Sequence, residues 1–580
     1  MKLADSEGFG KQELSVRRRW ACRDLLAASL LFLTTAGFVL WQNSQIAILW
    51  DLSYLLDTSW RIALGLTPYR DFPLVHPPLT FLIQAAIMRI AGRHYLLHVA
   101  YAAFVGGLGT VLAWRIMLRI LRDELRSGWW ISVLLAAPLT VLGVYSVYPH
   151  PIYDCDCAFA ILVALFLLQR IATGTSRSGF LTGAVAVVPV FFKQNIGLPF
   201  LLAAVAGTAV LLVINQIGKK RPAEVSSALL LSILAGIAAA SLAALALIQL
   251  TAGLGNYLHW TVQFAAQRRL PGFAEMLTVY QQPSFAWTLP CVGIGSLLLC
   301  LPLATRFWAR ILAFCLLSAP LIGSIVYLFL NDDLDERADN LLALWPMLLL
   351  LAAFVALIEL RKGVTLARLM PIFVLASIHG TFLSQQLWGS TYAIWPLLLL
   401  LIAQMLAVVP DAARRLVPAL AVVVCATFLV CGGLYGAGHE RMNYLNIPDE
   451  PLSRASLPVL LGMADRGPYL ADFEELVRFA AKEIPAQDGI LLLPGEEPFF
   501  FATGRKPQFP VQIFDNTTDP YSPTELLDEA RKRNIRWVIV KTRLQSNEDP
   551  LPGRAETLAL LAREFALYRK LAGYDVYFRR

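Results

Sequence analysis

The sequence predicts a polytopic α-helical membrane protein of about 13 transmembrane helices, followed by a C-terminal extracytoplasmic α/β domain. Hydrophobic residues make up 57% of the 580 residues and charged residues only 16%, whereas about a quarter of a soluble protein is charged. The mean hydropathy is +0.59. Apolar runs long enough to cross about 30 Å of hydrocarbon as helices recur from residue 24 to residue 436. Beyond about residue 440 the pattern becomes that of a soluble domain.

The apolar runs define the predicted membrane domain, residues 24–436. The first run lacks the small-residue cleavage pattern of a secretory signal, so we interpret it as a retained anchor. The predicted spans are 24–45, 95–121, 129–147, 153–170, 180–193, 196–217, 224–250, 284–304, 309–330, 341–358, 368–388, 391–408 and 416–436.

The charges between the spans predict the orientation. If the basic segment 1–23 is cytoplasmic, every inside connection carries Lys or Arg, as the positive-inside rule requires. The basic residues of these connections are Arg119, Arg122, Arg126, Arg170, Arg177, Lys219, Lys220, Arg221, Arg306, Arg310, Arg361, Lys362, Arg414 and Arg415. The outside connections are "YPHP", residues 251–283, "NDDLDERADN" and "WGST". An odd number of spans then places the C-terminus outside, and the net charge of +8 indicates topology rather than a nucleic-acid partner.

An outside loop, residues 46–94, follows the first span. It contains the apolar stretch "PPLTFLIQAAIMRIAG", which is short, begins with Pro-Pro and carries Gln84 and Arg89. We interpret this stretch as an interfacial or re-entrant helix. If it crossed the membrane, the basic connection at 119–126 would face outward.

The chain from residue 437 to residue 580 reads as an α/β domain. Residues 469–484 and 522–534 have helical periodicity, whereas residues 489–494, 536–542 and 574–580 have the composition of strands. No Gly-rich phosphate loop, HExxH or GxSxG motif occurs in the sequence. Nucleotide and hydrolase chemistry therefore has no support from motifs.

The outside loop is unusually rich in charge for a chain of this composition. Its charged and titratable residues include Asp51, Asp57, Arg61, Arg70, Asp71 and His76. A lone Asp at the end of a span can simply mark the membrane boundary, but several carboxylates close to hydrocarbon are costly unless they face a polar cavity. A carboxylate beside cations at the membrane surface suits a reaction that deprotonates a hydroxyl while an anionic group leaves.

The same loop carries a family pattern. An acidic residue ends the first span, a short helix follows, and then come "GLTPYRDF" and "HPPL", which place Gly65, Pro68, Tyr69, Arg70, Asp71, Phe72, Pro77, Pro78 and Leu79 in order. This loop resembles the first extracytoplasmic loop of the C-type glycosyltransferase (GT-C) superfamily, particularly its bacterial branch of aminoarabinose transferases and relatives of protein O-mannosyltransferases. Two departures are Leu52, where the family often has a second acid, and His76, where it has a phosphate-contacting Lys.

The resemblance implies a glycosyltransferase of the inner (plasma) membrane that moves a sugar from a polyprenyl-phosphate donor to a lipid, glycan or protein acceptor on the extracytoplasmic side. By position, Asp51 is the general base, and the reaction inverts the anomeric carbon without a covalent intermediate. The residues expected to bind the donor phosphate are His76, Arg70, Lys193, Arg268 and Arg269. For Lys193 a snorkelling lysine is the competing interpretation, and for the two Arg residues a headgroup-facing surface.

Four acidic residues are expected to line the cavity or bind the acceptor: Asp57, Asp71, Asp154 and Asp156. Asp57 is also placed for an ion pair with Arg61 at i+4. The sequence "YDCDC" places two Cys beside two Asp, but a C-x-C pair on a helix points its thiols about 200° apart, which is poor for one ion. We therefore expect no metal site and no cofactor.

Two other classes of protein remain open. A lipid-linked glycan ligase or polymerase would have the same loop and use a lipid-linked oligosaccharide. A lipid or solute transporter would also place polar residues near the membrane, but it predicts internal repeats and charge near mid-membrane, and neither is clear in the sequence.

The orientation is directly testable. A periplasm-active reporter fused after residue 460 should give a signal, and a cytoplasm-active reporter at the same place should not, because an odd span count with a cytoplasmic N-terminus puts the α/β domain outside. The opposite pair of signals would contradict the span count and the position of the α/β domain.

Overall fold

The structure is a computed structural model that describes residues 22–122, 124–171, 174–217, 225–331, 334–383, 392–438, 442 and 444–580, with the backbone alone for 334–342. Most of the basic segment 1–23, the residues Lys219, Lys220 and Arg221, and the connection "WGST" lie outside the described residues. Most of the acidic connection expected at 331–340 belongs instead to a helix, because α17 begins at Leu334.

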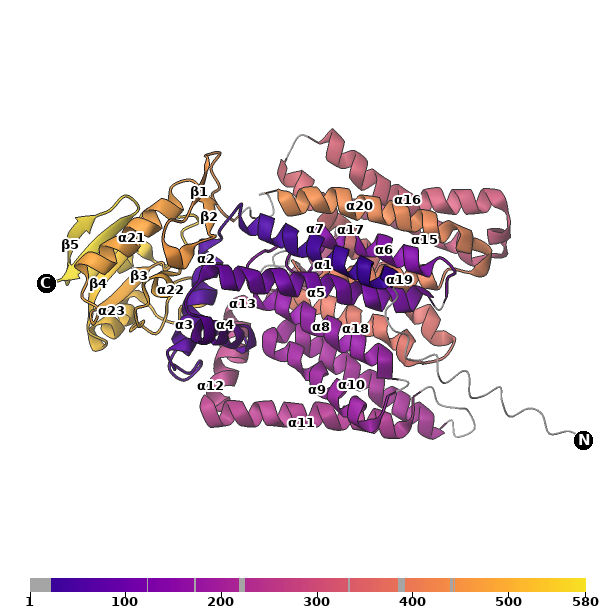
Figure 1. The fold of residues 1–580 in the computed structure, drawn as a ribbon, viewed down its shortest axis with the longest axis horizontal. Helices are drawn as coiled ribbons and strands as arrows, with labels where there is room; N and C mark the ends of the chain where they lie inside the picture. The colour runs from indigo at the N-terminus through magenta and orange to yellow at the C-terminus, as the bar shows by residue number, and fades with distance from the viewer. Residues whose placement is uncertain are drawn as a thin grey trace, which may run out of the picture.

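The part of the chain up to Ala437 is helical and forms an elongated bundle (Figure 1). Its longer helices are α1 (Cys22–Asn43), α5 (Tyr95–Arg122), α8 (Tyr153–Arg170), α9 (Ser176–Phe192), α10 (Gln194–Ile217), α11 (Ser227–Thr251), α15 (Phe285–Cys300), α16 (Phe307–Leu330), α17 (Leu334–Arg361), α18 (Leu366–Gly380), α19 (Trp395–Ala407) and α20 (Val417–Ala437). Two short helices, α6 (Gly128–Ala136) and α7 (Leu139–Leu142), replace the predicted span at 129–147.

Eight helices within the described residues are long and apolar enough to cross a membrane, or nine if the bent pair Phe273–Tyr280 and Phe285–Cys300 is one span. The predicted spans at 180–193 and 391–408 correspond to helices of 17 and 13 residues. The helix at 153–170 has 18 residues but carries Asp154, Asp156 and Arg170. The count of thirteen and the orientation stay predictions.

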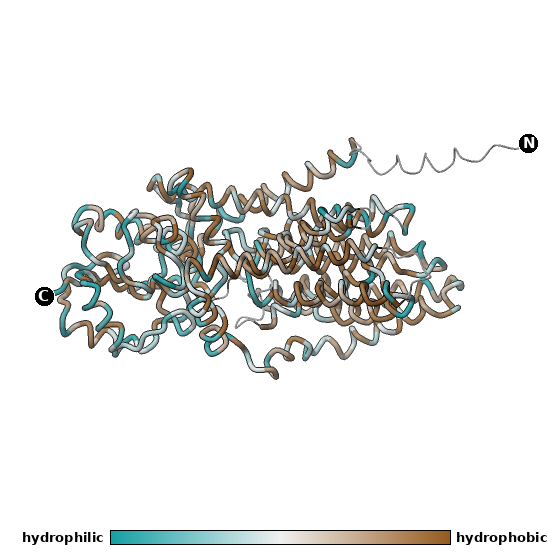
Figure 2. The backbone as a smooth tube through the Cα atoms, turned by 90° about the horizontal axis from the view of Figure 1, so that it is seen from below, coloured by the Kyte–Doolittle hydropathy of each residue, from teal (hydrophilic) through white to brown (hydrophobic). Residues whose placement is uncertain are grey.

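The outer surface of the bundle identifies a multi-pass membrane protein. Leucines that would be costly in water point outward along the helices, as in α11, where Leu242 and Leu250 are 68% and 85% exposed. Hydrophobic residues dominate the bundle, whereas hydrophilic residues gather in the C-terminal part (Figure 2). Such an exposed apolar surface is stable only in contact with lipid.

Short helices from two connections cover the end of the bundle that faces the C-terminal part (Figure 1). The first connection forms α2 (Leu49–Leu52), a π-helical turn (Ser53–Asp57), α3 (Thr58–Ala63) and α4 (Leu79–Ala91). The second forms α12 (Leu254–Leu258), a π-helical turn (His259–Phe264), α13 (Ala265–Arg269) and α14 (Phe273–Leu277). The 13 residues of α4 span only about 20 Å, in agreement with the interfacial or re-entrant helix that the sequence predicts.

The C-terminal part is an α/β unit. Its four-stranded sheet has the order β3-β4-β6-β5, with β3 parallel to β4 and the other pairs antiparallel. The strands are β3 (Gly489–Leu493), β4 (Ile535–Lys541), β5 (Phe565–Lys570) and β6 (Tyr574–Arg579), and the helices are α21 (Tyr469–Glu483), α22 (Phe499–Thr503), α23 (Pro523–Lys532) and α24 (Arg554–Leu561). A separate hairpin pairs β1 (Leu452–Arg454) with β2 (Ala464–Arg466). The predicted strands and helices are confirmed, and β5, which is mostly polar and exposed, was not expected.

The α/β unit shares a hydrophobic core with the first connection. One cluster of buried side chains joins Leu52 and Leu56 of that connection to Phe473 of α21, Phe499 of α22 and Trp537 of β4. A second cluster fills the other face of the sheet, and a third fills the helical bundle. The helix that carries Asp51 therefore packs against the C-terminal unit rather than only against the bundle.

Candidate functional site

Asp51 lies in α2, where the first connection meets both the bundle and the C-terminal unit. Its Oδ2 atom accepts hydrogen bonds from the hydroxyls of Tyr148, at 2.6 Å, and Tyr444, at 3.2 Å. Burial raises the pKa of Asp51, while the two tyrosine hydrogen bonds and the charge of Arg269 act in the opposite direction. A carboxylate with a raised pKa and fixed donors is suited to take up a proton.

Four other predicted residues form a chain of close contacts, and two of them lie near enough for their charges to shift the pKa of Asp51. Lys193 Nζ lies 2.9 Å from the Asp154 carboxylate and 4.4 Å from the centroid of the Tyr153 ring. The His76 ring stacks on the ring of the same tyrosine, Tyr153, with the two ring centroids 3.9 Å apart. The negative charge of Asp154 raises the pKa of Asp51, and the positive charge of Arg269 lowers it. We call this group of Asp51, His76, Asp154, Lys193, Arg269 and their tyrosine partners the Asp51 cluster.

His76 is a hydrogen-bond acceptor rather than a cation in this cluster. Arg269 Nη1 lies 3.3 Å from His76 Nε2, and the hydroxyl of Tyr54 lies 2.9 Å from His76 Nδ1. Burial, with the positive charges of Arg269 and Lys193, holds the pKa of His76 well below its usual value. The imidazole is therefore neutral near pH 7, and Arg269 and Lys193 supply the positive charge expected of His76.

The adjacent residues Arg268 and Arg269 separate in the structure. Arg269 reaches into the cluster, whereas Arg268 is exposed and donates from Nη1 to the carbonyl of Asn516 at 3.1 Å. Both follow the π-helical turn of the second connection, which carries them to the end of the bundle. Arg269 therefore belongs to the cluster, whereas Arg268 contacts the C-terminal unit.

The structure separates Asp156 from Asp154. The Asp156 carboxylate is 1% exposed and accepts hydrogen bonds from the hydroxyls of Thr80, Tyr101 and Tyr145, each at 2.7 Å. These donors come from α4, α5 and the segment before α8, so Asp156 joins three parts of the bundle. A carboxylate that accepts from three donors holds these segments together. Asp156 was expected to line a cavity, but it is not part of the lining of either cavity described below.

Asp57 and Arg61 do not form the expected ion pair within the described residues. Asp57 accepts from the backbone N–H groups of Phe500, at 3.1 Å, and Phe501, at 2.6 Å. Arg61 instead donates to Gln512 Oε1 and to two backbone carbonyls of the segment 509–510. Both side chains dock the C-terminal unit on the first connection.

Arg70 and Asp71 form an ion pair with each other at 2.9 Å. Asp71 also accepts from the backbone N–H of Thr67 at 2.7 Å. Both residues line a cavity of about 590 Å³ together with Arg61, Lys506 and Arg533, and none of the residues of the Asp51 cluster lines it. Asp71 thus lines a cavity that is separate from the Asp51 cluster, and the expected roles of Arg70 and Asp71 in phosphate or acceptor binding stay predictions.

Four tyrosines of the cluster were not predicted as site residues. Tyr148 and Tyr153 belong to "YPHPIYDCDC", a stretch that the sequence marked only for its Asp and Cys residues. Tyr54 lies three residues after Asp51, and Tyr444 follows the last helix of the bundle. No local pattern distinguishes these tyrosines from those that anchor a helix at the membrane interface.

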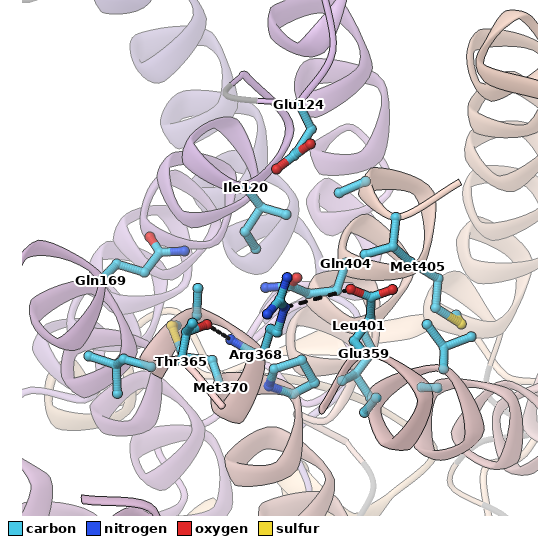
Figure 3. Close-up of a pocket in the computed structure, with 18 of the residues that line it drawn as sticks. Ile120, Glu124, Gln169, Glu359, Thr365, Arg368, Met370, Leu401, Gln404 and Met405 are labelled. Carbon is cyan, nitrogen blue, oxygen red and sulfur yellow. Dashed lines mark hydrogen bonds and ion pairs between the residues drawn. The ribbon is translucent and has the colours of Figure 1, made fainter. Parts of the chain in front are cut away.

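A second cavity, of about 410 Å³, lies between the ends of α5, α8, α17, α18 and α19 that point away from the C-terminal unit. Its polar lining includes Glu124, Gln169, Glu359, Arg368 and Gln404, and Figure 3 shows Arg368 directed toward Glu359. No residue of the Asp51 cluster lines this cavity.

The described residues contain no group of three or more His, Cys, Asp or Glu side chains arranged to hold a metal ion. Cys155 and Cys157 are buried free thiols, and Cys157 donates to the carbonyl of Pro189. They occupy the interior of the bundle rather than a shared ligand site.

No protein-family model matches the chain, and no curated protein matches it. Several solved structures are similar to it. ArnT from Cupriavidus metallidurans bound to undecaprenyl phosphate is 11% identical, with 95% of this chain and 97% of that chain covered and a TM-score of 0.44. The oligosaccharyltransferase AglB from Archaeoglobus fulgidus, in complex with an inhibitory peptide and a dolichol-phosphate, is 11% identical, with coverage of 90% and 69% and a TM-score of 0.48.

The arabinofuranosyltransferase AftD from Mycobacteria is also 11% identical, with 96% of this chain and 40% of that chain covered and a TM-score of 0.43. These three proteins are GT-C glycosyltransferases, the superfamily that the first connection resembles in sequence. The function proposed below rests on the residues of the Asp51 cluster.

The contact between His76 and Arg269 gives a test that does not depend on function. His76→Lys should lower the free energy of unfolding by roughly 2 kcal/mol, because a second buried cation would replace the acceptor of Arg269. His76→Gln keeps an acceptor and should cost less than half of that. Thermal unfolding in detergent measures both variants. Equal stability of the two would show that His76 does not act as the acceptor.

Proposed function

We propose that this protein is a membrane glycosyltransferase that transfers a sugar from a polyprenyl-phosphate donor to an acceptor hydroxyl on the extracytoplasmic side of the inner membrane. The observation that carries the proposal is the Asp51 cluster, which combines a carboxylate of raised pKa with two cations at one end of an apolar helical bundle. A base beside an anion-binding group is what transfer from a phosphate-linked sugar requires.

In the proposed reaction Asp51 removes the proton of the acceptor hydroxyl. The acceptor oxygen then bonds to the anomeric carbon as the bond from that carbon to the phosphate oxygen breaks, with inversion at the carbon. The electron pair of the broken bond stays on the phosphate, whose negative charge Arg269 and Lys193 stabilise. A single base is enough, since phosphate leaves without protonation by a second acid.

The two cations differ in what they can give to a phosphate. Lys193 is 6% exposed and shares its charge with Asp154 at 2.9 Å. Arg269 is partly exposed and contacts the neutral His76 ring, and no carboxylate within the described residues lies at ion-pair distance from it. We therefore assign Arg269 the direct phosphate contact, and Lys193 the role of fixing Asp154 at the wall of the site. A divalent metal is not part of the proposal, because the cluster already contains these cations.

Removing the base is the direct test. Asp51→Asn keeps the size of the side chain but not its basicity, so transfer should fall at least about 100-fold, or roughly 2.7 kcal/mol of transition-state stabilisation. Asp71→Asn is the matched control and should change transfer by less than about threefold, since Asp71 pairs with Arg70 outside the cluster. The measurement is transfer from a synthetic polyprenyl-phosphate sugar in detergent, with and without chelator.

Near-normal turnover of Asp51→Asn would contradict the assignment of the base. Loss of all turnover with chelator, restored by a divalent ion, would contradict transfer without metal. Transfer from a lipid-linked oligosaccharide but from no single-sugar donor would identify a glycan ligase instead.

The hydrogen bonds to Asp51 predict the pH dependence. The base must be deprotonated, so kcat falls as the pH drops through its raised pKa. The hydrogen bond from Tyr148 lowers that pKa, so Tyr148→Phe should raise it and move the acidic limb of the kcat profile to higher pH by roughly 1 unit. Tyr101→Phe, which removes one donor to Asp156, should leave the limb in place. If the acidic limb of the kcat profile lay at the same pH in wild type and in Tyr148→Phe, the titrating group would not be Asp51.

A further inference from the structure

Gln545 of the C-terminal unit reaches the backbone immediately before Asp51. Its side chain is fully buried. The amide oxygen accepts from the N–H of Leu49 at 3.0 Å, and the amide nitrogen donates to the carbonyl of Ala47 at 2.8 Å and to Asp465 Oδ2 at 2.6 Å. Leu49 is the first residue of α2, two residues before Asp51. One side chain therefore fixes the start of the helix that carries the proposed base.

The backbone around Gln545 holds the second partner of that base. The N–H of Asn446 donates to the carbonyl of Gln545 at 2.6 Å, and the N–H of Asn547 donates to the carbonyl of Tyr444 at 3.0 Å. The two strands of chain meet in an antiparallel bridge between Leu445 and Ser546. Because the Tyr444 hydroxyl donates to Asp51, the segment 545–547 positions both the base and one of its donors.

The segment 545–547 is itself anchored by a buried carboxylate. Glu496 is 0% exposed and accepts from the N–H groups of Gln545, at 3.0 Å, and Ser546, at 2.7 Å. The buried ammonium of Lys541 pairs with both Glu496 and Glu497. Removing Lys541 would leave two buried carboxylates without a cation, which is strongly unfavourable. This network gives the segment a single position.

A further bond fixes the other side of Asp51. The hydroxyl of Ser53 donates to the carbonyl of Gly495 at 2.7 Å, one residue before Glu496. The backbone is thus tied to the C-terminal unit two residues before Asp51 and two residues after it. Gly495, which accepts from Ser53, directly precedes Glu496, and Glu496 accepts from the N–H of Gln545. Both contacts therefore depend on the same buried network.

We propose that Gln545 is a positioning residue that sets the location and proton affinity of Asp51, so that the C-terminal unit is a working part of the active site. The inference rests on the proposed function, in which Asp51 is the base. Gln545 touches neither the carboxylate nor any other member of the cluster directly. Its side chain acts through Ala47 and Leu49 on the start of the helix that carries Asp51, whereas the backbone of 545–547 holds the segment of Tyr444.

Substitution by methionine tests this role, since Gln545→Met keeps the volume of a fully buried side chain and removes its hydrogen bonds. We expect kcat to fall about tenfold while KM for the donor changes less than twofold, because the phosphate contacts are untouched. The acidic limb of the kcat profile should move to higher pH, because the released start of α2 holds Asp51 less firmly against its tyrosine donors. Gln508→Met is the matched control in the same unit, where the side chain bonds only to the carbonyl of Gln487, and it should leave kcat and the limb unchanged.

Hydrogen–deuterium exchange of residues 47–53 gives a second readout that needs no activity. These amides should exchange faster in Gln545→Met than in wild type or Gln508→Met, while exchange across β3 and β4 stays unchanged. Gln545→Glu, which keeps the acceptor for Leu49 but places a third carboxylate beside Asp465 and Glu496, serves as a second variant if the methionine variant fails to fold. The same slower turnover and faster exchange are expected of it.

The outcomes separate the two proposals. Wild-type kcat and an unmoved limb in an active Gln545→Met enzyme would overturn the positioning role, as would slow turnover with unchanged exchange at residues 47–53. A wild-type protein without transferase activity would instead overturn the proposed function, and faster exchange in the variant would then still show that Gln545 holds the helix of Asp51.

Discussion

A carboxylate beside the hydrocarbon of a membrane depends on hydrogen-bond donors, and Asp51 obtains them from two distant segments. Tyr148 comes from the connection between α7 and α8, and Tyr444 from the segment that follows the last helix of the bundle. Because desolvation favours the protonated acid, these donors decide how far the carboxyl remains able to ionise. Asp51, the proposed base, therefore has both donors only when the bundle and the segment after its last helix are in place.

The buried cation of the cluster also depends on a partner. Lys193 is buried, and its charge is compatible with that position because Asp154 lies at ion-pair distance. Arg269 needs no carboxylate, since it is partly exposed and donates to a neutral imidazole. An Arg that no acid neutralises is the better partner for an incoming phosphate, and its fork of donors suits phosphate oxygens. Where the pattern that the first connection resembles has a Lys, this chain has the neutral His76, and the neighbouring cation is Arg269 of the second connection.

Several charges of the first connection serve assembly rather than chemistry. Asp57 and Arg61 bind backbone groups of the C-terminal unit, and the leucines between them contribute to a core shared by both parts. With Gln545 and Ser53 added, the connection that carries the base is held by contacts on several sides. Charge near a membrane can thus indicate a docking surface as well as a reaction site.

The membrane class, the approximate places of the helices and the α/β character of the C-terminal unit could be predicted from the sequence, which also marked Asp51, Lys193 and Asp154 as candidate site residues. These follow from local properties, since hydropathy over about 20 residues and strand or helix periodicity do not depend on distant contacts. The same properties could not tell Asp154 from Asp156, two residues apart on one helix, or Arg268 from its neighbour Arg269. Which member of each pair faces the site depends on the elements packed around it.

The hydrogen-bond partners of these residues follow from the three-dimensional fold. Tyr444 and Gln545 lie 393 and 494 residues after Asp51 in the chain, and no sequence pattern links them to it. The expected Asp57–Arg61 pair failed for the same reason, because backbone groups of the C-terminal unit are placed to bind each side chain separately. Local spacing determines which side chains share a helix face, but burial and competition from distant donors and acceptors decide which of them interact.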